Sequence, residues 1–335
     1  MKLLLLGAGG FLGSHIVEHM IARGDYDITG ADISDTKLAG ISGSNFEFIK
    51  ADLMGNTEVV EGLIKNADIV VDLISMPNPS LYVSDPLKIF NVTFRRNLEV
   101  VDLCVKHQKR LIQYSTSEIY GRPQSNTYQE DITPLVMGPV TNQRWIYAVS
   151  KQMLERVIHA YSLRDELEYS IIRPFNAIGP RLDYLVEGGT MGGPRVVAHF
   201  VSALLEDGPM YLVDGGLQRR SFTAVQDAST AFAAILDSPD AHNQIYHYGN
   251  PGNDTSIKGL AELMLEIYEE ITGKASGAYL EVVDAEQFYG KGYEDTTRVP
   301  PDISKLRSIG WEPKVSLRQT LTETLRYYMN QRGLL

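Results

Sequence analysis

Short apolar runs alternate with longer amphipathic stretches over the first half of the chain. Residues 2–6, 27–30, 46–50, 69–73 and 110–115 have the length and the apolar, β-branched character of buried strands. Helical patterns separate most of these runs. Strands that alternate with helices in this way predict βαβ units, and therefore a parallel sheet with right-handed crossovers.

The helical patterns divide the chain into a regular first half and a less regular second half. A strand at residues 171–173 continues the sheet and Pro174 ends it, after which glycine and proline crowd residues 179–194. A polar loop is expected at residues 286–302. The predicted helices begin near Phe11 and cover residues 88–108, 145–163, 195–207, 255–272 and 316–331.

Composition and charge narrow the function classes. The 335 residues are 44% hydrophobic and carry 31 Lys and Arg against 42 Asp and Glu, a net charge of -11. This balance argues against a surface that follows nucleic acid or an anionic membrane. Since no run of about 20 apolar residues occurs, we expect no membrane span, and we expect a cytoplasmic protein. We expect no metal site.

A glycine-rich turn follows the first strand and opens a helix. Its glycines, Gly7, Gly10 and Gly13, would permit a tight turn, close approach to a pyrophosphate and close helix packing. The pattern alone also fits an ordinary tight turn. Asp32 follows the second strand, where a carboxylate binds ribose hydroxyls and repels a 2′-phosphate, so NAD is favoured over NADP. Asp52 is either an adenine neighbour or a solvent-facing residue.

Two further segments carry candidate chemistry. Tyr147 and Lys151 are four residues apart on one helix face. The ammonium group, helped by the positive nicotinamide of the cofactor, would favour a phenolate that acts as general base. This spacing is also common in ordinary helices. Thr116, Ser117 and Glu118 follow a strand at the edge where open α/β sheets bind ligands, although a helix cap with an acidic first turn explains them equally.

Taken together, the glycine turn, Ser117, the Tyr147-x-x-x-Lys151 pair and residues 173–176 resemble the extended short-chain dehydrogenase/reductase family, which acts on nucleotide sugars. Within it, residues 144–147, 179–183 and 288–293 followed by Arg298 are similar to the branch that contains the oxidative UDP-glucuronate decarboxylases of polymyxin resistance. The UDP-apiose/UDP-xylose synthases are nearly as similar. The resemblance implies an NAD-dependent enzyme with a UDP-sugar substrate.

The resemblance also implies roles for individual residues. Tyr147 would be the base, Lys151 its partner, and Thr116 and Ser117 would hold the sugar, while Glu118, an acid or base, and Arg298 would lie beside the substrate carboxylate. A 4-epimerase would need only Ser117, Tyr147 and Lys151, and a non-catalytic nucleotide-binding protein is a third hypothesis. The expected substrate-binding residues are Asn176, Arg181, Arg220 and Tyr289. The expected cofactor-binding residues are Gly7, Gly10, Phe11, Leu12, Gly13, Asp32, Asp52, Tyr147 and Lys151.

These observations predict a Rossmann-type, doubly wound parallel sheet with a smaller, interleaved C-terminal substrate domain. The NAD-binding domain would comprise residues 1–175 and a returning segment at about 222–250. Residues 176–221 and 251–335 would form the substrate domain. Since members of the family often pair through two long helices, a homodimer is expected by resemblance.

Overall fold

A seven-stranded parallel sheet forms the larger part of the computed structural model, which describes residues 1–186, 190–192, 195–294 and 298–335. The strand order is β11-β6-β5-β4-β1-β2-β3, and every neighbouring pair is parallel. The order reverses at β1, as in a Rossmann sheet. The strands are β1 (Lys2–Leu6), β2 (Asp27–Asp32), β3 (Phe46–Lys50), β4 (Ile69–Asp72), β5 (Arg110–Tyr114), β6 (Tyr169–Pro174) and β11 (Gln244–Tyr248).

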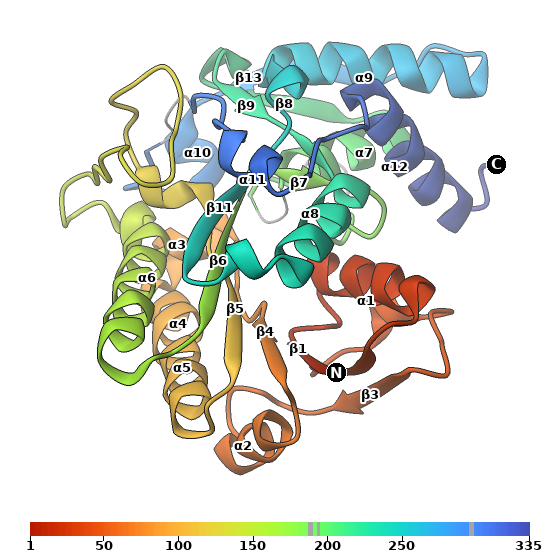
Figure 1. Cartoon of the computed structure of the whole chain (residues 1–335). Coiled ribbons are helices and arrows are strands. Elements are labelled where there is room, and N and C mark those ends of the chain that lie inside the picture. Colours follow the sequence, from red (N-terminus) through yellow and green to blue (C-terminus); the bar gives the residue numbers. More distant parts are fainter. Residues whose placement is uncertain (187–189, 193–194, 295–297) are drawn as a thin grey trace.

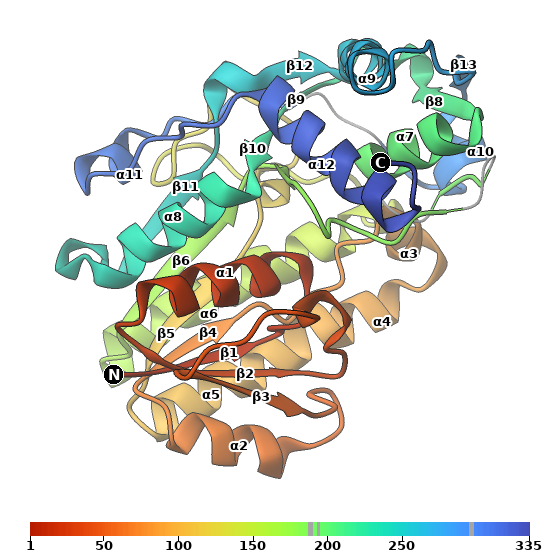
Figure 2. The same ribbon diagram turned by 90° about the vertical axis from the view of Figure 1, so that its right-hand side faces the viewer.

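Helices cover both faces of this sheet, as Figures 1 and 2 show. The four consecutive leucines of β1 are buried, because a strand between two helical layers has no solvent face. One face carries α1 (Phe11–Arg23) and α8 (Val225–Asp237), which contact each other. The other face carries α2 (Thr57–Lys65), α5 (Asn97–Lys106) and α6 (Ile146–Asp165), which enclose a second apolar cluster.

The connection that runs from β4 to β5 differs in detail from its prediction. One long helix was expected at residues 88–108. The structure has α3 (Pro79–Ser84), then α4 (Pro86–Phe90), a π-helical segment (Asn91–Arg96) and α5. The helix begins at Pro86 because Asp85 caps it, accepting a hydrogen bond from Lys88 N at 3.1 Å, and because proline suits the first helical position.

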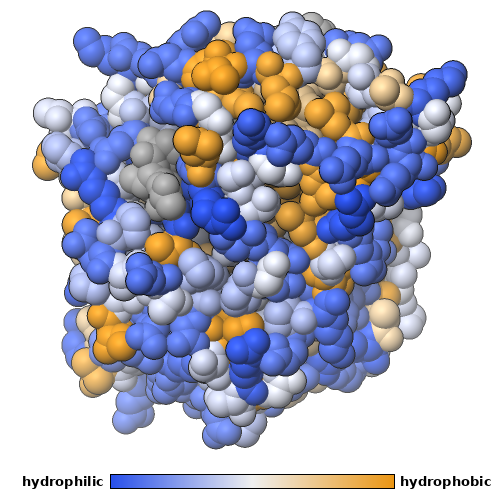
Figure 3. Space-filling view, turned by 90° about the horizontal axis from the view of Figure 1, so that it is seen from above, coloured by the Kyte–Doolittle hydropathy of each residue, from blue (hydrophilic) through white to orange (hydrophobic). Residues whose placement is uncertain are grey.

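A smaller region lies beyond the carboxyl ends of the strands and is built from residues 175–224 and 249–335. Its surface, seen from above in Figure 3, is mostly polar but gathers some hydrophobic side chains, and Leu217, Tyr279 and Val282 are exposed in this region. Its helices are α7 (Val196–Glu206), α9 (Ile257–Thr272), α10 (Ala285–Tyr289), α11 (Ser304–Ser308) and α12 (Leu317–Gln331). Its strands pair as β7 (Ala177–Ile178) with β10 (Thr223–Ala224), β8 (Pro209–Val213) with β13 (Tyr279–Val283), and β9 (Arg219–Ser221) with β12 (Asp254–Ser256).

The fold class is confirmed, and a second local correction concerns the smaller region. The expected polar loop at residues 286–302 begins as the short helix α10, whose cap Asp284 accepts a hydrogen bond from Glu286 N at 2.8 Å. A five-residue helix is too short to show a helical period, so the pattern did not reveal it. In the part of the chain that the structure describes, no helix is long and apolar enough to cross a membrane.

Candidate active site

A cavity of about 350 Å³ opens where the sheet meets the smaller region. Gly7, Leu73, Tyr114 and Pro174 bring the carboxyl ends of β1, β4, β5 and β6 to its wall, and α7, α10 and the strands of the smaller region close the opposite side. Open α/β sheets bind ligands at this edge. The expected residues that line it are Gly7, Gly10, Phe11, Leu12, Gly13, Thr116, Ser117, Glu118, Tyr147, Asn176, Arg220 and Tyr289.

The glycine turn is built for close backbone approach. Gly7 has a φ of 89°, a left-handed conformation that glycine adopts without strain. A Cβ atom on Gly9 would stand 1.8 Å from the carbonyl oxygen of Ser34, and one on Gly13 would stand 2.3 Å from that of Gly7. Within the described residues, no side chain caps α1 and no acidic residue lies in its first turn. The helix N-terminus therefore suits an anionic diphosphate.

Asp32 stands at the end of β2, beside this turn. Its carboxylate accepts hydrogen bonds from Gly9 N at 3.0 Å and from Ser34 N at 3.3 Å, and burial raises its pKa. This carboxylate and the glycine turn fit the ribose and diphosphate of NAD. Asp52 is exposed and accepts a hydrogen bond from Met54 N at 2.9 Å, which is a turn contact. Among the described cavity-lining residues, neither Asp32 nor Asp52 occurs.

Tyr147 lies in the first turn of α6 and projects into the cavity wall. Ser75 Oγ donates a hydrogen bond to its hydroxyl oxygen at 3.4 Å, and the ring of Tyr82 stacks on its ring at 5.0 Å. Burial raises the pKa of Tyr147, against the lowering effect of hydrogen bonds with Ser75 and Thr116. The expected phenolate depends on Lys151 together with the positive nicotinamide of bound NAD, so it stays a prediction.

Lys151 lies one helical turn after Tyr147 and is almost fully buried. Its Nζ atom donates hydrogen bonds to the Tyr114 carbonyl oxygen at 2.7 Å and to Asn97 Oδ1 at 3.1 Å. Burial lowers its pKa to about 8, although the carboxylate of Asp72 opposes the shift. Lys151 is absent from the described lining of the cavity. Lys151 therefore lies behind Tyr147, outside the described lining, and fixes the Tyr114 carbonyl group and the Asn97 side chain.

Glu118 is the centre of an ion-pair cluster on the cavity wall. Arg144 Nη1 and Arg298 Nη2 both donate to its Oε2 atom, at 2.6 Å and 2.7 Å. Burial alone would raise the pKa of Glu118, but the two guanidinium groups outweigh it and lower the pKa to about 2. The Glu118 side chain is thus ionised at neutral pH, and a carboxylate with so low a pKa suits an electrostatic role better than that of a proton donor or a general base.

The two arginines of this cluster occupy different depths. Arg144 lines the cavity, is 2% exposed and lies over the rings of Trp145 and Tyr293, at 4.6 and 5.5 Å from their centroids. Arg298 is 4% exposed, donates to the Gly121 carbonyl oxygen at 2.7 Å, and is not in the described cavity lining. Arg298 is connected to the cavity wall by its hydrogen bond to Glu118, which lines the cavity.

The expected nucleotide-binding residues divide into two groups. Asn176 and Arg220 line the cavity, and the backbone of Asn176, at a φ of 36°, turns the chain from β6 into the smaller region. Arg181 does not belong to the described lining. Its guanidinium group binds His15 and Glu18 on α1 and so connects the two regions, and its expected contact with the substrate stays a prediction.

Several cavity residues had no predicted role. Arg144 stood in a motif that carried the resemblance, and its place before a Tyr-x-x-x-Lys pair was the available signal. Arg195 lies 5.3 Å from the ring centroid of Phe11 and forms two hydrogen bonds with the Asp183 carboxylate, at 3.0 and 3.1 Å. Tyr82 and His199 also line the cavity. No local pattern distinguishes these three residues. Over the described ranges, no group of three metal-ligating side chains is present.

Comparisons with known proteins agree with this geometry. Residues 3–249 match the model of the NAD dependent epimerase/dehydratase family. The PbgP3 protein from Burkholderia pseudomallei is 32% identical, with 99% of this chain and 97% of that chain covered and a TM-score of 0.88.

Two more distant structures share the fold. They are the UDP-glucuronic acid 4-epimerase from Bacillus cereus in complex with UDP-glucuronic acid and NAD (23% identity, 99% and 100% covered, TM-score 0.82) and the dTDP-glucose 4,6-dehydratase from Bacillus anthracis in complex with NAD (22%, 100% and 98%, 0.80).

Proposed function

The chain belongs to the NAD dependent epimerase/dehydratase family, and from this premise we propose that it catalyses the oxidative decarboxylation of UDP-glucuronic acid. Its cofactor is NAD, and it is a nucleotide-sugar modifying enzyme. The choice of UDP-glucuronic acid as substrate, and of decarboxylation as reaction, is the part that we propose.

The Glu118 cluster is the observation that carries this proposal. Arg144, Arg298 and Arg220 contribute three positive charges around one carboxylate, and each of the three lowers the pKa of Glu118. The guanidinium groups of Arg144 and Arg220 at the cavity wall would attract an anionic group on the sugar. Ser117 and Tyr147 line the same cavity. Arginine suits this task because its planar fork pairs with carboxylates and phosphates.

The chemistry requires a proton acceptor and a stabilised sugar oxygen. NAD, when bound, supplies the acceptor for the hydride of C4. Tyr147 would take the proton of the C4 hydroxyl, while Thr116 and Ser117 hold that oxygen. With C4 a ketone, the C5 carboxylate is β to a carbonyl, so the C–C bond can break and its electron pair can enter the C4 oxygen. Hydroxyl donors around that oxygen would stabilise the enolate.

Lys151 and Glu118 each position other groups of the cavity wall for this reaction. Lys151 holds the Tyr114 carbonyl oxygen and Asn97, and so fixes the wall from which Thr116 projects. Glu118, ionised between two arginines, limits their positive charge and keeps the guanidinium group of Arg144 at the cavity wall. That guanidinium group would bind the carboxylate of the substrate, and the CO2 that leaves is neutral and would not be held there.

A 4-epimerase of UDP-glucuronate or another UDP-sugar is the second candidate. It is favoured by the presence of Ser117, Tyr147 and Lys151, which suffice for removal and return of a hydride. An epimerase leaves the mass of the sugar unchanged, so the product distinguishes the two reactions. A non-catalytic protein that only binds the nucleotide is a third candidate, and the intact Tyr147 and Lys151 speak against it.

The test is incubation of the purified protein with NAD+ and UDP-glucuronic acid, with CO2 trapped and the sugar identified by mass. We expect CO2 from the wild type and none from Glu118→Gln or Arg298→Met, although both variants should still bind NAD. Arg318→Met is the matched control, because Arg318 is an exposed arginine that pairs with Glu266 and Glu270 on α9. An unchanged sugar mass with the wild type would contradict the proposal.

A further inference from the structure

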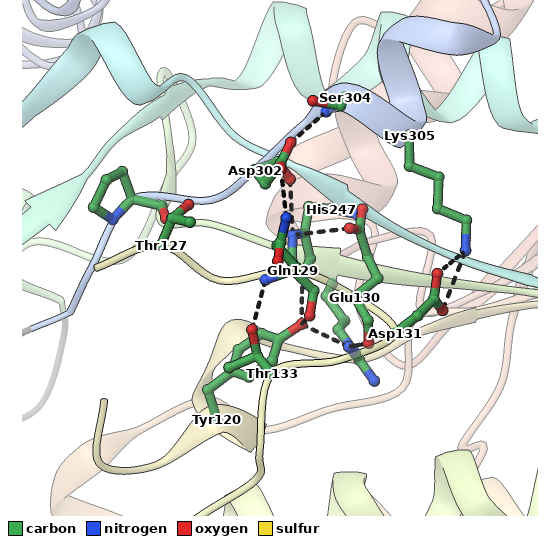
Figure 4. A network of polar contacts seen from close by, with 12 residues as sticks. Tyr120, Thr127, Gln129, Glu130, Asp131, Thr133, His247, Asp302, Ser304 and Lys305 are labelled. Atoms are coloured by element: carbon green, nitrogen blue, oxygen red, sulfur yellow. Dashed lines mark hydrogen bonds and ion pairs between the residues drawn. The ribbon is translucent and has the colours of Figure 1, made fainter. Parts of the chain in front are cut away.

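A fully buried histidine joins the two segments that carry Glu118 and Arg298. His247 lies on β11, at the edge of the sheet, and Figure 4 shows its ring between Tyr120 and Asp302. Tyr120 ends the short helix that begins at Ser117, and Asp302 lies four residues after Arg298.

Both ring nitrogens of His247 have a partner, and these partners determine the tautomer. Nδ1 lies 3.0 Å from the carbonyl oxygen of Asp302, which can only accept, so Nδ1 carries the proton. Nε2 then accepts from the Tyr120 hydroxyl at 2.5 Å. That hydroxyl in turn receives a hydrogen bond from Arg173 Nη1 at 2.6 Å, while its contact with the Gln129 carbonyl oxygen is longer, at 3.5 Å. The imidazole is therefore neutral, with Nδ1 as hydrogen-bond donor and Nε2 as acceptor.

Further contacts hold the same two segments together. Tyr128 N donates to the Pro300 carbonyl oxygen at 3.1 Å, and Asp302 N donates to the Tyr128 carbonyl oxygen at 2.7 Å. Gln129 Nε2 donates to Asp302 Oδ2 at 3.1 Å. These bonds connect the segment of residues 127–129 with that of residues 300–302. His247 adds the connection to Tyr120, which is only two residues from Glu118.

The charged groups around the ring favour this neutral state. Burial and the positive charge of Arg173 lower the pKa of His247 to about 3, whereas Asp302 opposes the shift. The Glu130 carboxylate accepts a hydrogen bond from His247 N at 2.9 Å and lies 3.6 Å from Nδ1, but that proton is directed at Asp302. The positive charge of Lys305, which pairs with Asp131, also lowers the pKa of His247, by a smaller amount.

We propose that His247 is a positioning residue: its two hydrogen bonds set the distance between Glu118 and Arg298 and so the selectivity of the cavity for a sugar carboxylate. The inference rests on the proposed function, because it assigns that cluster to the carboxylate. An apolar ring of the same size would fill the space but would leave Tyr120 and Asp302 without this link. His247 acts through Tyr120 and the residue 298–302 segment and does not touch the substrate.

The test is the ratio of dissociation constants for UDP-glucose and UDP-glucuronic acid, two ligands that differ in the carboxylate. NADH in place of NAD+ prevents oxidation during the measurement. We expect His247→Phe and Tyr120→Phe each to reduce the preference for UDP-glucuronic acid about tenfold, since a displaced charged group loses much of its effect. Binding of UDP-glucose should change little. The double variant should lose no more than either single variant, because both break one link.

Two further variants separate positioning from packing. His247→Gln keeps an acceptor for Tyr120 and a donor for Asp302, so it should restore part of the preference. Tyr248→Phe is the matched control on β11: its ring is buried, and its hydroxyl has no hydrogen-bond partner among the described residues. It should keep the wild-type ratio. An unchanged ratio in folded His247→Phe and Tyr120→Phe, or an additive loss in the double variant, would overturn the inference.

Failure of the proposed function would appear separately. A wild type that binds both sugars equally would remove the carboxylate role of the cluster. The positional role of His247 is then measured by amide hydrogen exchange of residues 117–121 and 298–302. Faster exchange of both segments in Tyr120→Phe and His247→Phe supports the link, and unchanged exchange overturns it.

Discussion

Replacement of His247 by glutamine should flatten the dependence of stability on pH between about pH 7 and pH 5. The folded protein holds the ring neutral, with its pKa lowered from an ordinary value of 6.5 to about 3 by burial and by Arg173. At a pH between 6.5 and about 3, the His247 ring binds a proton in the unfolded chain but not in the folded chain. The stability that this histidine allows is therefore present above its unfolded pKa and is lost as the pH falls below it.

The size of the effect follows from this difference in pKa. Each unit of pKa difference corresponds to about 1.4 kcal/mol, and the full difference would reach about 5 kcal/mol only near pH 3. Between pH 7 and pH 5 the wild type should lose about 2 kcal/mol that the His247→Gln variant keeps. The other histidines with lowered pKa values, among them His15 and His199, are common to both proteins, so their contributions cancel.

Urea unfolding followed by tryptophan fluorescence provides the assay, because Trp145 and Trp311 are both buried. Unfolding free energies are compared at pH 7, 6 and 5. The variant should be less stable than the wild type at pH 7, since a flexible glutamine restores only part of the contacts with Tyr120 and Asp302, but its curve should be flatter. Parallel curves for the two proteins would show that His247 is not held neutral by the fold, contrary to the expected result.

Three other substitutions probe the cofactor site and the base. Gly9→Ala would place a Cβ atom 1.8 Å from the Ser34 carbonyl oxygen, so NAD binding measured by calorimetry should weaken more than about tenfold; wild-type affinity would contradict this. Asp32→Asn should lower the preference for NAD over NADP, read as a ratio of dissociation constants, and a constant ratio would exclude this role. Ser75→Ala removes a donor to Tyr147, so the pKa of Tyr147 should rise and the rate profile should shift to higher pH; an unmoved profile would show that Ser75 has no such effect.

The sheet could be predicted because its signal is local. The leucines of β1 and the apolar runs of β4 and β5 indicate strands that are buried on both faces. This pattern can be identified from each run alone, without knowing which strands lie beside it. The π-helical segment from Asn91 to Arg96 and the short helix α10 depend on local backbone geometry and on capping. The spacing of hydrophobic residues indicates neither of these two elements.

The candidate site was partly predictable, because the carboxyl ends of parallel strands meet at one edge. This rule brought the glycine turn and Ser117 to the same cavity. The pairing of Glu118 with Arg298 spans 180 residues and came only from family resemblance. Burial, which raises the pKa of Tyr147 in the protein alone, is a property of the folded chain, so the sequence could not indicate it.

Other parts of the cavity depend on tertiary contacts that no short pattern contains. Arg195 is placed by Asp183, twelve residues earlier, and by the ring of Phe11 on the first helix. Arg181 was expected at the substrate because of its motif, but His15 and Glu18 bind it on α1. In both cases the partner of the arginine decides its role.

We propose that the cluster of Glu118 with Arg144 and Arg298 serves a sugar carboxylate that leaves as CO2. The most direct measurement uses UDP-glucuronic acid labelled with 13C at its carboxylate, incubated with NAD+ and the wild-type protein. We expect labelled CO2 and an unlabelled UDP-linked pentose or 4-ketopentose. A UDP-linked hexuronic acid that retains all of its label, with no labelled CO2, would contradict it.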